Sequence, residues 1–249
     1  LSNAVEIAEL GSFVAKMKAL NLPNCVFIDN TASPLPSKFY KEAFEANISV
    51  VTCNKIANSG EYAQFADLKN TAQKHGVDFY YETNVGAGLH IIKTLNDLMI
   101  SGDKISKIEA ILSGTISYIF NNFKGEANFH DVVKMAQEKG YTEPDPRDDL
   151  GGIDFMRKML ILARNAGLPL DAKDVKLGEI IPESCSKAPS VADFYQELQN
   201  SNAHFEQMKN DAAIAGKVLR YIGKLENGKV EISMQAVGAD HPFYALSGS

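Results

Sequence analysis

The densest group of side chains that could do chemistry lies between Gly140 and Lys158. An acidic loop over residues 140–150 holds four carboxylates and two prolines: Glu143, Asp145, Asp148, Asp149, Pro144 and Pro146. Carboxylates held close together repel and raise one another's pKa, so a stiff acidic loop is costly if it merely faces solvent. Asp154 and Lys158 follow at four-residue spacing, which places them on one face of a helix.

Lys158 has two interpretations on this spacing. As a surface ion pair with Asp154 it would contribute about 0.3 to 0.5 kcal/mol to stability. Because it follows a carboxylate-rich loop, its ammonium could instead give or accept a proton in a reaction.

Two further polar groups follow short apolar runs. Thr52-Cys53-Asn54-Lys55 comes directly after residues 48–51, and Asp29–Ser33 comes after residues 25–28. Open parallel sheets bind ligands at the carboxyl ends of their strands, where both groups would lie. Lys55 could equally be a solvated lysine, and the Asp29–Ser33 group a helix cap before Pro34.

The expected secondary structure explains how these groups are positioned. Spacing and turn residues predict helices over 5–20, 38–46, 61–74, 89–99, 129–139, 153–165, 191–198 and 205–216. They predict strands over 25–28, 48–51, 77–81, 107–112, 175–180, 218–225 and 230–237. The early alternation of strand and helix indicates βαβ units with buried parallel strands. Gly140 is expected to end a helix. Asn227-Gly228 is expected to form the turn of a β-hairpin. We place a domain border near residue 100, giving domains 1–100 and 101–249.

Composition narrows the class of protein. The 249 residues are 45% hydrophobic and 22% charged, and the formal net charge is -6, all typical of a soluble globular chain. No basic segment suits nucleic acid, and no apolar stretch is long enough to span a membrane, so we expect a cytoplasmic protein without either partner. The three cysteines lack metal-ligand or disulfide spacing, and the five histidines lack zinc-site spacing.

Several motifs together resemble homoserine dehydrogenase. The match is carried by residues 141–150 with Asp154 and Lys158, and by four further segments in the same order, at 51–55, 83–89, 112–119 and 216–221. The overall pattern is most similar to the dehydrogenase part of bifunctional aspartokinase/homoserine dehydrogenases. The resemblance implies an α/β fold, with a partial Rossmann-like parallel sheet lacking its first βα unit and an α+β substrate, catalytic and dimerisation domain. It also implies a homo-oligomer and a possible fusion to an upstream aspartokinase.

The resemblance further implies NAD(P)-dependent interconversion of L-aspartate 4-semialdehyde and L-homoserine, in threonine, methionine and isoleucine biosynthesis. Lys158 would donate the proton and Lys55 would be a second active-site lysine near the cofactor. The substrate would contact five residues and the cofactor two: Glu143, Asp154, Gly114, Thr115 and Tyr141, then Thr31 and Lys55. NAD or NADP remains open as the cofactor.

The loop around Gly86-Ala87-Gly88 has three interpretations: a phosphate cradle, a tight turn, or the monovalent-cation loop of the family. The last would bind sodium through the backbone carbonyls of Glu82, Val85, Ala87 and Leu89. Because the family's first strand and glycine-rich phosphate loop are not in this sequence, we expect this chain alone to bind NAD(P) weakly. The alternatives are a catalytically incompetent, non-enzymatic module that keeps the substrate site, and another NAD(P)-linked semialdehyde dehydrogenase.

Overall fold

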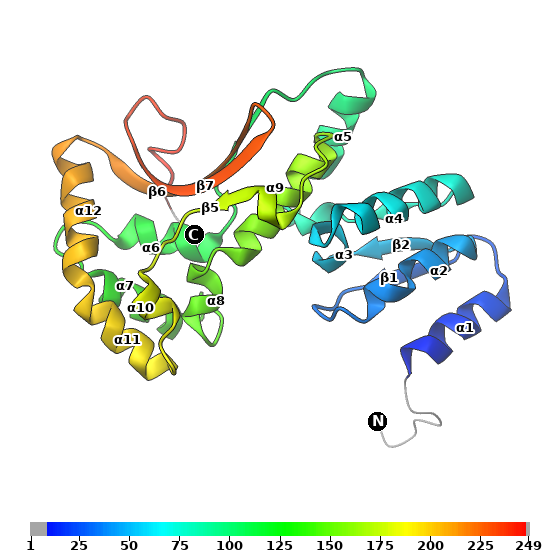
Figure 1. The fold of residues 1–249 in the computed structure, drawn as a ribbon, viewed down its shortest axis with the longest axis horizontal. Helices are drawn as coiled ribbons and strands as arrows, with labels where there is room; N and C mark the ends of the chain where they lie inside the picture. Colours follow the sequence, from blue (N-terminus) through cyan, green and yellow to red (C-terminus); the bar gives the residue numbers. More distant parts are fainter. Residues whose placement is uncertain (1–8, 248–249) are drawn as a thin grey trace. The chain divides into compact units, whose positions relative to one another are not determined.

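The computed structural model describes residues 9–247, and its contacts divide the chain into two compact units. Unit 1 comprises Leu1–Lys104 and Leu160–Ala172, and unit 2 comprises Ile105–Met159 and Lys173–Ser249. Each unit has its own sheet (Figure 1). No helix of the described residues is long and apolar enough to cross a bilayer.

Unit 1 is built on a three-stranded parallel sheet in the order β1-β2-β3. The strands are β1 (Val26–Asp29), β2 (Ser49–Thr52) and β3 (Phe79–Tyr80). The helices of this unit are α1 (Leu10–Leu20), η1 (Pro36–Phe39), α2 (Tyr40–Glu45), α3 (Ile56–Ser59), α4 (Tyr62–His75), η2 (Glu82–Asn84) and α5 (Ile91–Ile100). Residues 5–8 of the first predicted helix lie outside the described residues. The predicted α/β fold with a parallel sheet is confirmed.

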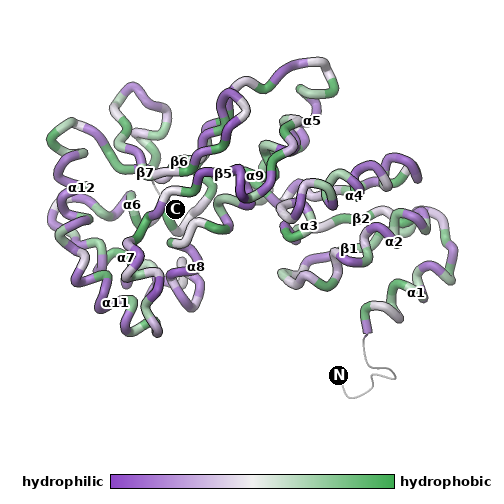
Figure 2. Tube along the Cα trace, viewed as in Figure 1, coloured by the Kyte–Doolittle hydropathy of each residue, from purple (hydrophilic) through white to green (hydrophobic). Residues whose placement is uncertain are grey.

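The sheet of unit 1 is buried on one face only. Phe27 and Val50 pack with Tyr40 and Phe44 of α2 in the core of this unit. On the opposite face Ile28 is 63% exposed and Val51 is 37% exposed. The expectation of fully buried strands was therefore wrong for alternate residues, since an apolar run does not say whether helices cover both faces. In Figure 2 the β2 segment is mainly hydrophobic, whereas α4 mixes hydrophilic and hydrophobic residues.

Unit 2 contains a four-stranded mixed sheet in the order β4-β6-β7-β5. Its strands are β4 (Lys107–Ala110), β5 (Val175–Leu177), β6 (Val218–Glu226) and β7 (Lys229–Val237). β4 and β7 are antiparallel to β6, and β5 is parallel to β7. Asn227 and Gly228 both have positive φ, of 52° and 74°, which confirms the predicted hairpin turn.

The helices of unit 2 gather on one side of the β6–β7 hairpin (Figure 1). They are α6 (Gly114–Asn122), α7 (Phe129–Glu138), α8 (Pro146–Leu150), α10 (Glu183–Ser186), α11 (Val191–Asn200) and α12 (Asn202–Ile214), while η3 (Ala172–Asp174) precedes β5. Helix α9 (Ile153–Asn165) contributes its first seven residues, up to Met159, to this unit. Gly140 follows α7 with φ 71°, as predicted.

Gly223 determines how closely α9 approaches the sheet. A Cβ at this position would lie 2.5 Å from Met159 Sδ and 2.7 Å from a ring carbon of Phe155. Only glycine therefore permits this contact between β6 and the helix. The contact fixes the part of α9 that carries Asp154 and Lys158.

Candidate active site

Lys158 is held in place by two neighbours in unit 2. Its Nζ donates to the backbone carbonyl of Leu112 at 2.8 Å and lies 2.7 Å from Asp154 Oδ2. The Lys158 side chain is only 19% exposed. An isolated surface ion pair would leave the lysine largely solvated, so the buried stem and the carbonyl contact favour a positioned ammonium. An ammonium has three N–H donors, and among the described residues these contacts use two of them.

Two carboxylates predicted to bind substrate are open to solvent. The Asp154 side chain is 51% exposed beside Lys158, and Glu143 is exposed in the acidic loop. The backbone N–H of Glu143 donates to Asp149 Oδ2 at 2.8 Å. Asp149, a loop carboxylate for which the sequence predicted no individual role, therefore fixes the backbone of Glu143.

Gly114 and Thr115 begin helix α6 and lie next to the segment that holds Lys158. Ser113 caps the helix, since its Oγ accepts from the N–H of Ile116 at 3.2 Å. The N–H groups of Gly114 and Thr115 precede the first intrahelical hydrogen bond, so they can bind an anionic group. Thr115 Oγ1 donates to the carbonyl of Tyr141 at 2.6 Å, which joins α6 to the start of the acidic loop.

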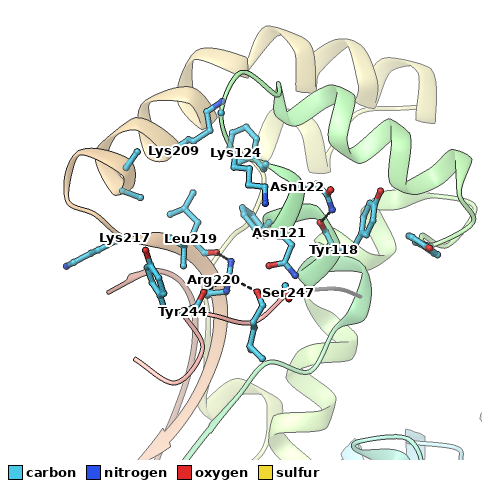
Figure 3. Close-up of a pocket in the computed structure, with 18 residues that line it drawn as sticks. Tyr118, Asn121, Asn122, Lys124, Lys209, Lys217, Leu219, Arg220, Tyr244 and Ser247 are labelled. Carbon is cyan, nitrogen blue, oxygen red and sulfur yellow. Dashed lines mark hydrogen bonds between the residues drawn. The ribbon is translucent and has the colours of Figure 1, made fainter. Parts of the chain in front are cut away.

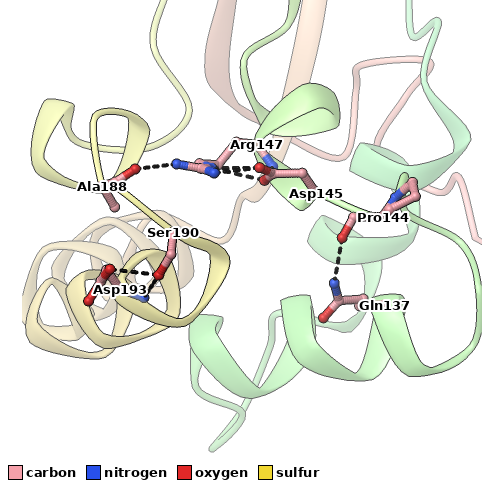
Figure 4. Close-up of polar contacts among 7 residues, drawn as sticks. All are labelled: Gln137, Pro144, Asp145, Arg147, Ala188, Ser190 and Asp193. Atoms are coloured by element: carbon pink, nitrogen blue, oxygen red, sulfur yellow. Dashed lines mark hydrogen bonds and ion pairs between the residues drawn. The ribbon is translucent and has the colours of Figure 1, made fainter.

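The acidic loop is anchored on both sides (Figure 4). Arg147 Nε donates to both oxygens of Asp145, at 2.8 and 3.0 Å, and its Nη1 donates to the carbonyl of Ala188. Gln137 Nε2 of α7 donates to the carbonyl of Pro144 at 3.0 Å. The Arg147 guanidinium lowers the pKa of the Asp145 carboxyl below its usual range. Asp145 and Arg147 therefore stabilise the conformation of the acidic loop.

The acidic loop also contains a helix that the sequence analysis did not predict. Asp145 accepts from the N–H of Arg147 at 3.0 Å, and Pro146 occupies the first position of the five-residue helix α8. An aspartate followed by proline is a recognised helix start. This signal was present in the sequence and could have located α8.

In unit 1, Thr31 and Lys55 lie just beyond the carboxyl ends of β1 and β2. Thr31 is exposed and its N–H donates to Asp29 Oδ1 at 2.8 Å. Lys55 is half-buried before α3, and its carbonyl accepts from Ser59 Oγ at 2.8 Å. The predicted placement of both residues at this edge of the sheet is thus observed.

A buried polar network that was not predicted from the sequence joins the carboxyl ends of β1 and β2. Asp29, Thr52 and Asn54 are 2%, 2% and 3% exposed. The Tyr40 hydroxyl lies 2.5 Å from Asp29 Oδ2 and 3.0 Å from Thr52 Oγ1. Burial, with the adjacent Asp29 carboxylate, raises the pKa of Tyr40, which stays a neutral donor. Asn54 Nδ2 donates to Asp29 Oδ2 at 3.1 Å.

The loop at residues 82–89 is a sharply turned segment. Gly86 and Ala87 have positive φ, of 82° and 50°, and a Cβ on Gly86 would lie 2.6 Å from Ile91 Cγ1. The Glu82 carboxylate accepts from the N–H groups of Ile92 and Lys93, at 2.9 and 2.8 Å, and so caps α5. Its side chain therefore serves the helix, and only its backbone carbonyl is available to the loop.

The predicted cation ligands are all backbone carbonyls. The carbonyls of Glu82 and Leu89 each accept one backbone hydrogen bond, from Val85 at 3.4 Å and from Ile91 at 2.9 Å. Each carbonyl oxygen has two lone pairs, so both retain one for a ligand. Across residues 9–247, no three His, Cys, Asp or Glu side chains cluster to bind a metal. The donor set thus suits only a hard cation.

Unit 2 also contains a cavity of about 600 Å³ between α6, α12, β6 and the C-terminal segment (Figure 3). Arg220 lies in its wall and donates to the carbonyls of Phe243, Tyr244 and Leu246 at 3.0 to 3.1 Å. Burial lowers the pKa of Arg220. Of the predicted site residues, Tyr141 is the one that lines this cavity.

The structure thus arranges the predicted residues in two sets. In unit 2, hydrogen bonds and an ion pair connect Lys158, Asp154, Thr115 and Tyr141 through the segment 112–115, and Glu143 joins them through the loop backbone. In unit 1, Thr31 and Lys55 share the carboxyl edge of the sheet, and the loop 82–89 follows β3.

Comparisons with known proteins identify the family of both parts of the chain. Residues 91–249 match the homoserine dehydrogenase family, and residues 1–82 match the NAD-binding domain of homoserine dehydrogenase. A bifunctional aspartokinase/homoserine dehydrogenase of Zea mays is 43% identical over 252 residues, covering the whole chain and 28% of the maize protein. Homoserine dehydrogenase of Saccharomyces cerevisiae is 38% identical, covering 96% of this chain and 68% of the yeast protein.

Solved structures with a similar fold include two at 27% identity or more. A Candida auris protein of unknown function superposes with a TM-score of 0.92 at 37% identity, covering 97% of this chain and 70% of that one. A homoserine dehydrogenase described as putative, from Archaeoglobus fulgidus, superposes with a TM-score of 0.70 at 27% identity, covering 90% of this chain and 62% of that one. The chain spans 28% of the length of the maize protein, and about two thirds of the yeast protein. With its two matched segments and its identity to the yeast enzyme, this chain belongs to the homoserine dehydrogenase family.

Proposed function

We propose that this protein interconverts L-aspartate 4-semialdehyde and L-homoserine, using NAD or NADP. The observation that carries the proposal is the Lys158 ammonium, fixed between the Leu112 carbonyl and the Asp154 carboxylate. In the reducing direction, the aldehyde carbon accepts a hydride and the aldehyde oxygen accepts a proton, which together give the alcohol. The bound nicotinamide supplies that hydride.

Lys158 is the proton donor in this proposal. A carbonyl carbon that accepts hydride leaves negative charge on its oxygen, and a positioned ammonium stabilises that charge and then donates a proton to the oxygen. The Leu112 carbonyl and Asp154 hold Nζ so that its remaining N–H can point at the substrate oxygen. In the oxidising direction, the Lys158 amine accepts the proton from the hydroxyl.

Glu143 and Asp154 bind the ammonium group that distinguishes these substrates from 3-hydroxy acids and neutral semialdehydes. Both carboxylates are exposed, so they can reach a ligand without first breaking a buried network. The N–H groups of Gly114 and Thr115, at the start of α6, suit the substrate carboxylate. The hydrogen bond from Thr115 Oγ1 to the Tyr141 carbonyl supports Tyr141 as a neighbour of the same substrate.

Thr31 and Lys55 are the proposed cofactor contacts. The site fits a dinucleotide because both residues follow parallel strands at the edge where open α/β sheets bind such ligands. Thr31 presents a small hydroxyl at an exposed position, and Lys55 a cation, which suit ribose and phosphate groups. One solved hyperthermophilic archaeal homoserine dehydrogenase is described as a complex with NADPH.

A sodium ion in the loop 82–89 is a further part of the proposal. Four carbonyls on one tight turn, those of Glu82, Val85, Ala87 and Leu89, provide the oxygen ligands that a hard cation prefers. Thermal melting in sodium chloride and in tetramethylammonium chloride at equal ionic strength tests it. We expect a higher melting temperature in sodium, and equal values would remove the ion from the proposal.

The enzymatic test uses the protein expressed from its full reading frame. We expect homoserine-dependent reduction of NADP or NAD, followed by absorbance of the reduced nicotinamide, and little turnover of 3-hydroxy acids of the same chain length. Faster turnover of a substrate without an amino group would contradict the roles of Glu143 and Asp154. Absence of turnover with every substrate would favour the non-catalytic alternative.

A further inference from the structure

We propose that Asn54 is a positioning residue that holds in one geometry the two segments of unit 1 that begin at the predicted cofactor contacts Thr31 and Lys55, residues 31–35 and 55–59. The proposal rests on the proposed function for its kinetic consequences. Asn54 is 3% exposed. It acts through the backbone around Thr31 and Lys55.

The polar groups of Asn54 make two hydrogen bonds to the distant segment around β1 and two to residues close in sequence. Its Nδ2 donates to the carbonyl of Ser33 at 2.7 Å and to Asp29 Oδ2 at 3.1 Å. Its Oδ1 accepts from the N–H of Ile56 at 3.0 Å, and its own N–H donates to Thr52 Oγ1 at 2.9 Å. The side-chain amide therefore joins the end of β1 and the segment after Thr31 to the chain just before Lys55, and its oxygen forms a local turn with the first residue of α3.

The other hydrogen bonds of the segment 31–35 are mainly local, including two from η1, in which Ser37 Oγ donates to the Pro34 carbonyl at 2.9 Å and the N–H of Lys38 donates to the Leu35 carbonyl at 3.2 Å. The segment's internal hydrogen bonds are two short-range turns, in which Ser33 N donates to Thr31 Oγ1 and Leu35 N donates to Ser33 Oγ, both at 3.2 Å. Such turns define local shape but do not attach the segment to the sheet. The bond from Asn54 Nδ2 to the Ser33 carbonyl makes that attachment, and the bond from Thr31 N to Asp29 Oδ1 completes it.

Both parts of the clamp depend on the buried side chain of Asn54. If the amide is removed, the Ser33 carbonyl loses a buried donor and the Ile56 N–H loses its acceptor, so both segments relax together. A displacement of about 1 Å in a positioning group can cost roughly 100-fold in rate. Asn54 should therefore affect cofactor affinity and turnover although it lies below both cofactor contacts.

The test compares three variants of the protein expressed from its full reading frame. Asn54→Ala removes both halves of the clamp. Asn54→Ser keeps a hydroxyl that can accept from the N–H two residues later but cannot reach the Ser33 carbonyl. Asn165→Ala is the matched control, because Asn165 is another buried asparagine of unit 1, at 8% exposure, whose side-chain bonds go to Tyr81 and Ile161.

Hydrogen exchange provides a readout that does not depend on catalysis. In Asn54→Ala we expect amide exchange to accelerate at least tenfold in both 31–35 and 55–59, while Asn54→Ser accelerates only 31–35. Asn165→Ala should leave both segments unchanged. Unchanged amide exchange of both segments in Asn54→Ala would overturn the clamp. An unfolded Asn54→Ser variant would also overturn it, since Asn54 would then be required for the fold as a whole.

Kinetics and cofactor titration provide the second readout. We expect both Asn54 variants to raise the Kd for NADPH about 10- to 100-fold, with the larger fall in kcat at saturating NADPH in Asn54→Ala. The KM for homoserine should change less than twofold. A rise confined to the KM for homoserine would overturn the proposal. If the wild-type protein does not oxidise homoserine but exchange responds as expected, the proposed function fails and the clamp stands.

Discussion

Replacement of Lys158 by alanine should separate catalysis from stability. In the structure, Lys158 makes one hydrogen bond to the Leu112 carbonyl and one ion pair with the half-exposed Asp154. A typical hydrogen bond contributes about 1 kcal/mol, and an exposed pair contributes roughly 0 to 1 kcal/mol. Lys158→Ala should therefore lower the free energy of unfolding by only about 1 to 2 kcal/mol.

The expected loss in catalysis is much larger. Removing a positioned general acid lowers kcat by about 10² to 10⁴, equivalent to roughly 2.7 to 5.5 kcal/mol of transition-state stabilisation. We would measure kcat for homoserine oxidation and the urea midpoint on the same preparations. Lys187→Ala is the control, since Lys187 forms an exposed i,i+4 ion pair with Glu183 in the same unit. Lys158→Ala with near-normal kcat would refute the reasoning and leave the residue as an ion-pair partner.

Three further outcomes are expected. Glu143→Ala and Asp154→Ala should each raise the KM for homoserine about 10- to 100-fold, because a charge-assisted hydrogen bond contributes about 1.5 to 3 kcal/mol. The melting temperature should change little. An unchanged KM would assign both carboxylates to the fold. Arg147 lowers the pKa of Asp145, so the pair's stabilisation is present above the unfolded pKa of aspartate, near 3.9, and is lost as pH falls through the lower folded value. Arg147→Ala should therefore lower the melting temperature more at pH ~7 than at pH ~3, and equal losses would contradict the coupling. The Arg164 side chain is fully buried and donates to the carbonyls of Asn58, Gly60 and Leu170. Arg164→Ala should therefore lower the free energy of unfolding, measured by urea titration, by more than about 3 kcal/mol. A decrease below about 1 kcal/mol would show that water replaces the guanidinium.

Much of the fold could be predicted because its signals are local. The turn at Asn227-Gly228 and the end of α7 at Gly140 depend on residues that tolerate positive φ, and both lie where expected. Helices α6 and α8 were missed because their starts depend on a single cap, Ser113 or Asp145, which the apolar spacing does not reveal. Exposure of one face of β1 and β2 depends on packing that no local pattern reports.

The candidate site was predictable in residue type more than in geometry. Lys158 could be proposed from its spacing to Asp154, but its bond to Leu112 joins residues distant in sequence and appears only in the structure. Asn54 was quoted only as part of a motif, since a lone asparagine does not indicate that four partners surround it. The individual roles of Lys158, Glu143, Asp154 and Lys55 remain predictions.

The sheet of unit 2 has a consequence for the order of folding. β6 and β7 are joined by the two-residue turn at Asn227-Gly228. β4 is distant from β6 in sequence, and their pairing places Lys107 opposite Glu226. Hairpins of this kind form in microseconds, but pairing that closes a long loop is slow. We therefore expect the hairpin to form first and to serve as the template on which β4 docks. The segment 112–115 follows β4 directly, so the contacts that hold Lys158 should be among the last to form during folding.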